Sequence, residues 1–126
     1  YWSLSHKSEY AAGVASNRTT GIDLEKIKPY REAIKKKVAR QVEWDLGGST
    51  PSCDLFFRYW TSKEAVLKAT GQGLKGLSSC RIISIPDKHN QRLDCLGREW
   101  AVEHFYFHGY IASVIKDGYD IIWSVL

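Results

Sequence analysis

The 126-residue sequence contains no methionine, and it begins Tyr1-Trp2-Ser3. We therefore expect either that its start has been removed or that it is a piece of a longer polypeptide. No apolar run approaches the roughly 20 residues that a membrane helix requires, so a membrane-spanning class of protein is excluded.

Cysteine is scarce, with three residues at Cys53, Cys80 and Cys95. Their number is odd, and no two of them have Cys-x-x-Cys spacing. This pattern predicts neither a disulfide framework nor a zinc site, and it favours a reducing, cytoplasmic compartment.

The composition is that of a folded domain, because 44% of the residues are hydrophobic and 13% are aromatic. The length fits a single domain over residues 1–126. The net charge is +4, and seven basic residues lie between Lys26 and Arg40, opposed there by Glu32. This run is either a solvated helix face or a surface that meets a polyanion, such as nucleic acid, a phosphorylated ligand or an acidic protein.

The order of predicted elements is strands, then helices, then strands. Two short strands are expected at 9–16 and 20–26. A helix is expected from Pro29 to Val42 on its apolar spacing, and a second from a Thr50 cap to Thr70. Five strands then follow at 80–86, 91–96, 99–107, 110–116 and 120–125. This segregation predicts an α+β fold, an antiparallel sheet with two main helices.

The strand at 20–26 contains Asp23 and Glu25, which point to the same face because side chains alternate along a strand. Two adjacent carboxylates repel each other, and a hard cation such as Mg²⁺ relieves the repulsion. Taken alone, an exposed strand face that carries two acids is the commoner explanation of this pattern.

The second helix contains Lys63, Glu64 and Lys68. Glu64 and Lys68 lie one turn apart on one face, which fits an ordinary surface ion pair. Lys63 falls in an apolar arc of the helix. It either extends along that arc toward water or is a buried lysine held for an anionic ligand.

Two other patterns in the sequence do not indicate a binding site. Residues 71–76 spell G-x-G-x-x-G, but a helix precedes them, which excludes a dinucleotide-binding turn. We expect these glycines to end the helix and to bring Lys75 back past the face of Lys63 and Lys68. His104 and His108 would lie about 13 Å apart on one strand, too far for one metal ion.

Taken together, these segments resemble the signature of the 4'-phosphopantetheinyl transferases. The run 21–25 (Gly-Ile-Asp-Leu-Glu) matches its G-[IV]-D-x-E strand, and Glu64 follows 41 positions after Asp23 in a match to [FW]-[SCT]-x-K-E-[AS]-x-x-K. The run 4–6 (Leu-Ser-His) also matches, although the family often has serine at the next position, where this chain has Lys7. The resemblance covers residues 4 to about 77, and it is to the later part of the two-lobed, surfactin-synthetase-activating type.

The resemblance implies a magnesium-dependent transfer of 4'-phosphopantetheine from coenzyme A to a serine of an acyl or peptidyl carrier protein. Asp23, Glu25 and Glu64 would hold Mg²⁺, and Glu64 or a metal-bound water would take the serine proton. Lys63 and Lys68 would neutralise the phosphates of coenzyme A. Ser5 and His6 would contact its 3'-phosphate or ribose.

The implied partner is an acidic carrier protein on the basic helix at 29–42, with no nucleic acid and no membrane. Residues 1–19 are alternatively the last strands of an N-terminal lobe, and either that lobe or a second copy would complete the chain. Two other functions are compatible with the residues. A magnesium nuclease accounts for the acids and the basic helix, and a non-catalytic basic binding domain accounts for the charge.

Overall fold

The computed structural model describes residues 1–72 and 74–126, and at Leu74 and Lys75 the backbone alone. In chain order, the elements are β1 (Trp2–His6), β2 (Ala11–Ala15), β3 (Ile22–Lys26), α1 (Glu32–Val38), α2 (Gln41–Asp45), α3 (Ser52–Thr70), a 3₁₀ turn (Leu74–Ser79), β4 (Cys80–Asp87), β5 (Asn90–Cys95), β6 (Arg98–Phe107) and β7 (Tyr110–Ile115). No helix in the described residues is long and apolar enough to cross a membrane.

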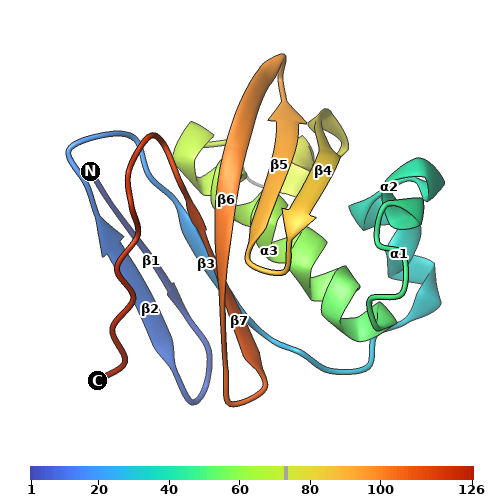
Figure 1. The fold of residues 1–126 in the computed structure, drawn as a ribbon, viewed down its shortest axis with the longest axis horizontal. Coiled ribbons are helices and arrows are strands. Elements are labelled where there is room, and N and C mark those ends of the chain that lie inside the picture. The colour runs from blue at the N-terminus through green and yellow to red at the C-terminus, as the bar shows by residue number, and fades with distance from the viewer. Residues whose placement is uncertain (73) are drawn as a thin grey trace.

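The predicted α+β fold is confirmed. Five antiparallel strands form one sheet in the order β3-β7-β6-β5-β4, and β1 and β2 form a separate hairpin. Figure 1 shows α3 crossing one face of the sheet, with α1 and α2 beyond one end of it and the β1–β2 hairpin at the other.

The main core lies between α3 and the sheet. Tyr59, Val66 and Leu67 are fully buried there against Leu93 and Ile111 of the strands. A smaller cluster of Leu24, Tyr110 and Ala112 lies on the opposite face of the sheet, under the hairpin and the C-terminal segment. Side chains alternate along β3, so Leu24 packs in this smaller cluster while Asp23 and Glu25 face α3.

Two glycines are required by close approach and by backbone conformation. A Cβ on Gly21 would lie 2.0 Å from the Ala65 carbonyl oxygen, so the start of β3 can contact α3 only with glycine there. Gly71 has a φ of +76° and ends α3 in the left-handed conformation, as the sequence predicts.

The predicted helix from Pro29 to Val42 is wrong in extent. The chain forms α1 and α2 instead, separated by Ala39 and Arg40 in extended conformation. Side chains from elsewhere bind the carbonyls that a continuous helix would use: Lys63 Nζ donates to Val38 O, and Trp44 Nε1 donates to Ala39 O. Tertiary contacts therefore override the local helical pattern.

Three further predictions about local structure are wrong. The helix α3 has Pro51 rather than Thr50 at its N-cap. Residues 120–125 form no strand, and β7, the strand before them, is paired on both sides by β3 and β6. The structure joins Cys80 and Cys95, which face each other across β4 and β5, in a disulfide. The cysteine pattern therefore no longer supports a reducing compartment.

Candidate active site

The site is built from three elements that meet beside the edge of the sheet. Asp23 and Glu25 project from β3 toward α3, and α3 presents Trp60, Glu64 and Lys68 at four-residue intervals on one face. The end of β1 and the turn after it close the third side. Together they line a pocket of about 410 Å³, whose walls are Leu4, Ser5, His6, Lys7, Asp23, Glu25, Trp60, Glu64 and Lys68.

The hairpin is tied to β3 by serine side chains. Ser3 Oγ accepts the Ile22 N–H (3.1 Å), and Ser5 Oγ accepts the Leu24 N–H (3.1 Å). The Ser5 hydroxyl in turn donates to Asp23 Oδ1 at 3.2 Å. Ser5 is thus buried and positions Asp23, whereas His6 is exposed on the pocket wall.

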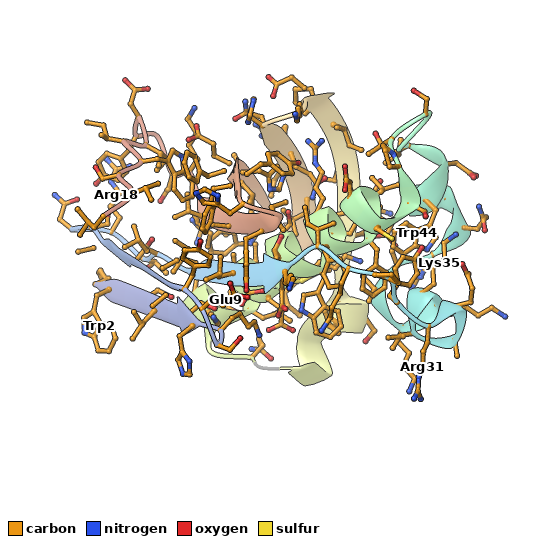
Figure 2. The ribbon with its side chains drawn as sticks, turned by 90° about the horizontal axis from the view of Figure 1, so that it is seen from below. Trp2, Glu9, Arg18, Arg31, Lys35 and Trp44 are labelled. Carbon is orange, nitrogen blue, oxygen red and sulfur yellow. A yellow bond between two sulfur atoms is a disulfide. The ribbon has the colours of Figure 1, made fainter. Side chains whose placement is uncertain are left out.

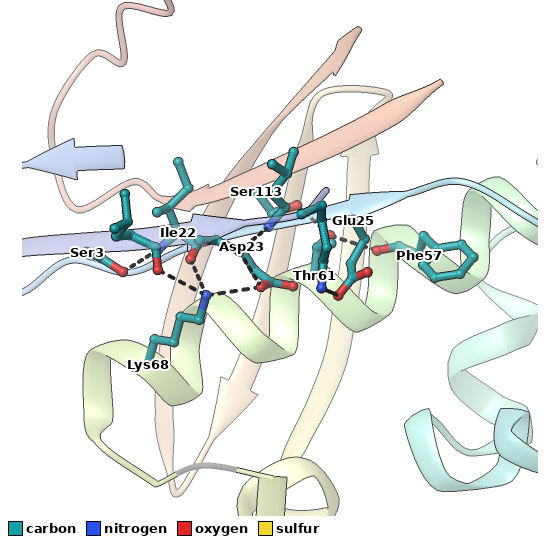
Figure 3. Close-up of polar contacts among 12 residues, drawn as sticks. Ser3, Ile22, Asp23, Glu25, Phe57, Thr61, Lys68 and Ser113 are labelled. Carbon is teal, nitrogen blue, oxygen red and sulfur yellow. Dashed lines mark hydrogen bonds and ion pairs between the residues drawn. The ribbon is translucent and has the colours of Figure 1, made fainter. Parts of the chain in front are cut away.

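Two ammonium groups contact the acidic cluster. Lys68 Nζ lies 3.1 Å from Asp23 Oδ1 and also donates to the Ile22 carbonyl at 3.0 Å. Lys7 Nζ lies 3.0 Å from Glu25 Oε1. Figure 3 shows Lys68 reaching from α3 to the backbone and carboxylate of β3. The cation expected to pair with Glu64 along the helix therefore pairs across to the strand.

At two carboxylates of this pocket, the effect of burial on the pKa is larger than the opposing effect of the nearby lysines. Burial raises the pKa of Asp23, and Lys68 only partly opposes the increase. Burial also raises the pKa of Glu64, and the nearby Asp23 charge raises it further. Asp23 Oδ2 and Glu64 Oε1 are buried, and among the described residues neither has a hydrogen-bond partner.

These atoms bear on whether the pocket fits a divalent cation. Carboxylate oxygens are the donors that Mg²⁺ prefers, and two unpartnered ones from different elements form a suitable donor set. Within the described residues, however, no three His, Cys, Asp or Glu side chains lie close enough together to hold one metal ion. The donor chemistry fits Mg²⁺, while Glu25 is engaged by Lys7.

Lys63 does not reach this pocket, so its predicted contact with the phosphates of coenzyme A is not supported. Its side chain is 1% exposed, and its Nζ binds Glu43 Oε1 at 2.7 Å and Val38 O at 2.6 Å. It is a buried lysine held for an anion, but that anion is an internal carboxylate. Sequence reasoning missed Glu43, and no local pattern marks it as buried, since its neighbour Val42 is 63% exposed. The expectation for Lys75 concerns a side chain outside the described residues.

The basic residues of the predicted helix lie at the far end of the fold from the hairpin. Arg31, Lys36 and Lys37 are exposed, while Lys35 lies over the Trp44 ring at 5.3 Å. Figure 2 shows Arg31 projecting outward on this side and Lys35 beside Trp44.

An acidic pocket with unpartnered carboxylates and flanking ammonium groups is typical of proteins that bind a phosphate-bearing ligand together with a divalent cation. The comparisons with known proteins name the family. The family model of the 4'-phosphopantetheinyl transferase superfamily matches residues 19–119. The chain belongs to this superfamily.

Individual relatives agree with this assignment. The chain is 40% identical over 91 residues to the 4'-phosphopantetheinyl transferase HetI of Nostoc sp., covering 68% of this chain and 38% of that protein. It is 36% identical over 83 residues to the 4'-phosphopantetheinyl transferase psf-1 of Bacillus pumilus, covering 63% and 36%. It is 28% identical over 103 residues to the 4'-phosphopantetheinyl transferase Sfp of Bacillus subtilis, covering 71% and 46%. The chain thus spans less than half the length of these relatives.

Proposed function

We propose that this chain carries the active site of a magnesium-dependent enzyme that transfers 4'-phosphopantetheine from coenzyme A to a serine of an acyl or peptidyl carrier protein. The observation that carries the proposal is a pair of buried oxygens, one of Asp23 and one of Glu64, that have no partner among the residues the structure describes, with the Lys68 ammonium group bound to Asp23. Relatives that are named for this activity, and a family model that spans most of the chain, support it.

In the proposed reaction, the carrier serine oxygen forms a bond to the β-phosphorus of coenzyme A. The bond from that phosphorus to the bridging oxygen breaks, and 3',5'-ADP leaves. Asp23, Glu25 and Glu64 would hold Mg²⁺, which when bound neutralises the pyrophosphate charge. Lys68 would stabilise the charge that grows on the leaving oxygen, from a position already fixed by its contacts with β3.

Glu64 is the proposed acceptor of the serine proton. Its raised pKa makes its carboxylate a stronger base, and within the described part of the chain Oε1 has no partner that would have to be displaced. His6 would contact the 3'-phosphate or ribose from the exposed pocket wall, while Ser5 would act on the reaction through its hydrogen bond to Asp23.

The proposed carrier partner is acidic and meets the exposed basic side chains of α1. This assignment rests on charge complementarity between Arg31, Lys36 and Lys37 and an acidic protein surface. Since coenzyme A and apo carrier proteins are substrates found in the cytoplasm, we propose that compartment for the reaction.

The test is mass spectrometry of an apo carrier protein incubated with this protein, coenzyme A and Mg²⁺. A gain of one phosphopantetheine supports the proposal. Asp23→Asn and Glu64→Gln should abolish the gain, and Asp45→Asn, an exposed acid remote from the pocket, should preserve it. No gain with any carrier, together with magnesium-dependent digestion of DNA or RNA, would instead identify a nuclease.

We further propose that a second lobe of the same parent polypeptide covers the outer face of the β1–β2 hairpin. Trp2 and Leu4 point away from β3 on this face and are 77% and 56% exposed, and Figure 2 shows Trp2 directed outward. Folded monomers avoid such apolar patches. Light scattering on the 126-residue chain tests the idea. A stable monomer with full transfer activity would contradict it, and a symmetric dimer would assign the face to a second copy.

A further inference from the structure

Lys7 is a cation inside the acidic pocket that the proposed chemistry does not use. It follows β1 in the turn of the hairpin, and its side chain is 39% exposed. Its Nζ lies 3.0 Å from Glu25 Oε1, and it is one of the residues that line the pocket. The side chain therefore enters the space in which a ligand would bind, instead of extending into open solvent.

The field of Lys7 extends beyond Glu25. Its charge lowers the pKa of Asp23 and of Glu64, against the larger effect of burial on both. Lys7 thus acts electrostatically on each of the three carboxylates, although it contacts one. The three carboxylates carry three negative charges when ionised, and Lys7 and Lys68 offset two of them.

This arrangement leaves Glu25 in a different state from its neighbours. Asp23 and Glu64 each keep one buried oxygen that has no partner in the part of the chain that the structure describes, whereas Glu25 is paired with Lys7. Among the described residues no three acidic or metal-binding side chains are close enough together to hold one metal ion. Lys7 holds Oε1 of Glu25, so a divalent cation that binds this oxygen has to displace the ammonium group.

We propose that Lys7 competes with the divalent cation for Glu25 and, when released, adds a positive charge for the anionic ligand, so that it sets the balance between metal affinity and coenzyme A affinity. This inference rests on the proposed function, because it assumes that the pocket binds both a divalent cation and coenzyme A. The two effects have opposite signs. Removing the ammonium makes the pocket more negative, which strengthens cation binding and weakens anion binding.

The experiment compares Lys7→Gln with two controls. Lys7→Arg keeps the charge, and Lys88→Gln removes the same charge from an exposed site on the β4–β5 turn, outside the pocket. Binding of Mn²⁺ alone is measured by electron paramagnetic resonance of the free ion. Binding of coenzyme A is measured by calorimetry in the presence of a chelator. Neither readout depends on turnover.

We expect Lys7→Gln to bind Mn²⁺ roughly two- to fivefold more tightly and coenzyme A weaker by a similar factor, the scale of a partly exposed ion pair. Lys7→Arg and Lys88→Gln should bind both like the wild type. If the wild type binds Mn²⁺ and Lys7→Gln binds it equally well, the inference fails and the metal site stands. If Lys7→Gln binds Mn²⁺ more tightly without losing coenzyme A affinity, the proposed dual role is wrong. If the wild type binds no Mn²⁺, the proposed metal site fails, and the competition at Glu25 fails with it.

Discussion

The buried ion pair between Lys63 and Glu43 gives a prediction whose size follows from its surroundings. The side chains are 1% and 3% exposed, and Nζ and Oε1 are 2.7 Å apart. Glu43 also accepts the N–H groups of Arg40 (2.7 Å) and Ile82 (2.9 Å). The pair therefore connects α2, α3 and β4 at the point where α1 ends.

Removing one partner of such a pair leaves a buried charge without compensation, which costs about 3–5 kcal/mol. We expect Lys63→Met to lower the free energy of unfolding by about 3 kcal/mol, because the Glu43 carboxylate keeps its two N–H donors. Glu43→Gln should cost a similar amount, since the Lys63 ammonium keeps only Val38 O. The double variant has no buried charge at this position, and we expect it to lose only about 2 kcal/mol.

Urea denaturation followed by circular dichroism measures all four proteins. With a slope of about 1–3 kcal/mol per molar urea, a loss of about 3 kcal/mol moves the midpoint by about 1–3 M. The double-mutant cycle should give a coupling of at least ~2 kcal/mol. Single losses below ~1 kcal/mol, or additivity within ~0.5 kcal/mol, would refute the reasoning. Folded Lys63→Met should also bind coenzyme A normally, since Lys63 does not line the pocket.

Three further predictions concern the pocket and the basic surface. Burial raises the pKa values of Asp23 and Glu64, so the metal-free protein should gain stability as the pH falls through those values. The gain is about 1.4 kcal/mol for each unit by which the folded pKa of a group exceeds its unfolded pKa. Asp23→Asn and Glu64→Gln should each flatten the dependence of stability on pH in thermal melts, and an unchanged slope would contradict the assignment. Lys68→Ala should lower kcat for transfer more than it weakens coenzyme A binding, because the charge on the leaving group peaks in the transition state; an equal effect on both would make Lys68 a binding residue only. Reversing the three lysines at 35–37 to glutamate should raise KM for the carrier and leave KM for coenzyme A unchanged; equal losses would place them in the coenzyme pocket.

The parts of the fold that the sequence predicts are those fixed by local pattern. The helix α3 and the four strands from β4 to β7 follow from apolar periodicity and from turns such as Gly71 and Gly109, which need positive φ. Two of the failures, the break in the predicted helix and the disulfide, involve partners distant in sequence. The break after Val38 depends on a lysine 25 residues away, and Cys80 meets Cys95 only because β4 and β5 pair in a particular register.

For the site, the period of each element predicts that Asp23 and Glu25 share one strand face and that Glu64 and Lys68 share one helix face. The meeting of the two faces follows from Gly21, which lets β3 approach the α3 backbone. Period does not determine which cation pairs with which carboxylate. Helical spacing predicts Lys68 beside Glu64, yet it reaches across to Asp23, and no local pattern predicts that Lys7 contacts an acid.

The adjacent residues Lys63 and Glu64 show why a motif cannot be assigned to function as a unit. Successive residues on a helix are about 100° apart, so the two side chains diverge. Lys63 enters the core and binds Glu43, whereas Glu64 faces Asp23 and Lys7 in the pocket. Both residues match the sequence pattern, but Lys63 stabilises the junction of α1, α2 and α3, whereas Glu64 lines the pocket. A Lys63 variant with low activity must therefore be tested for folding before its loss is attributed to phosphate binding.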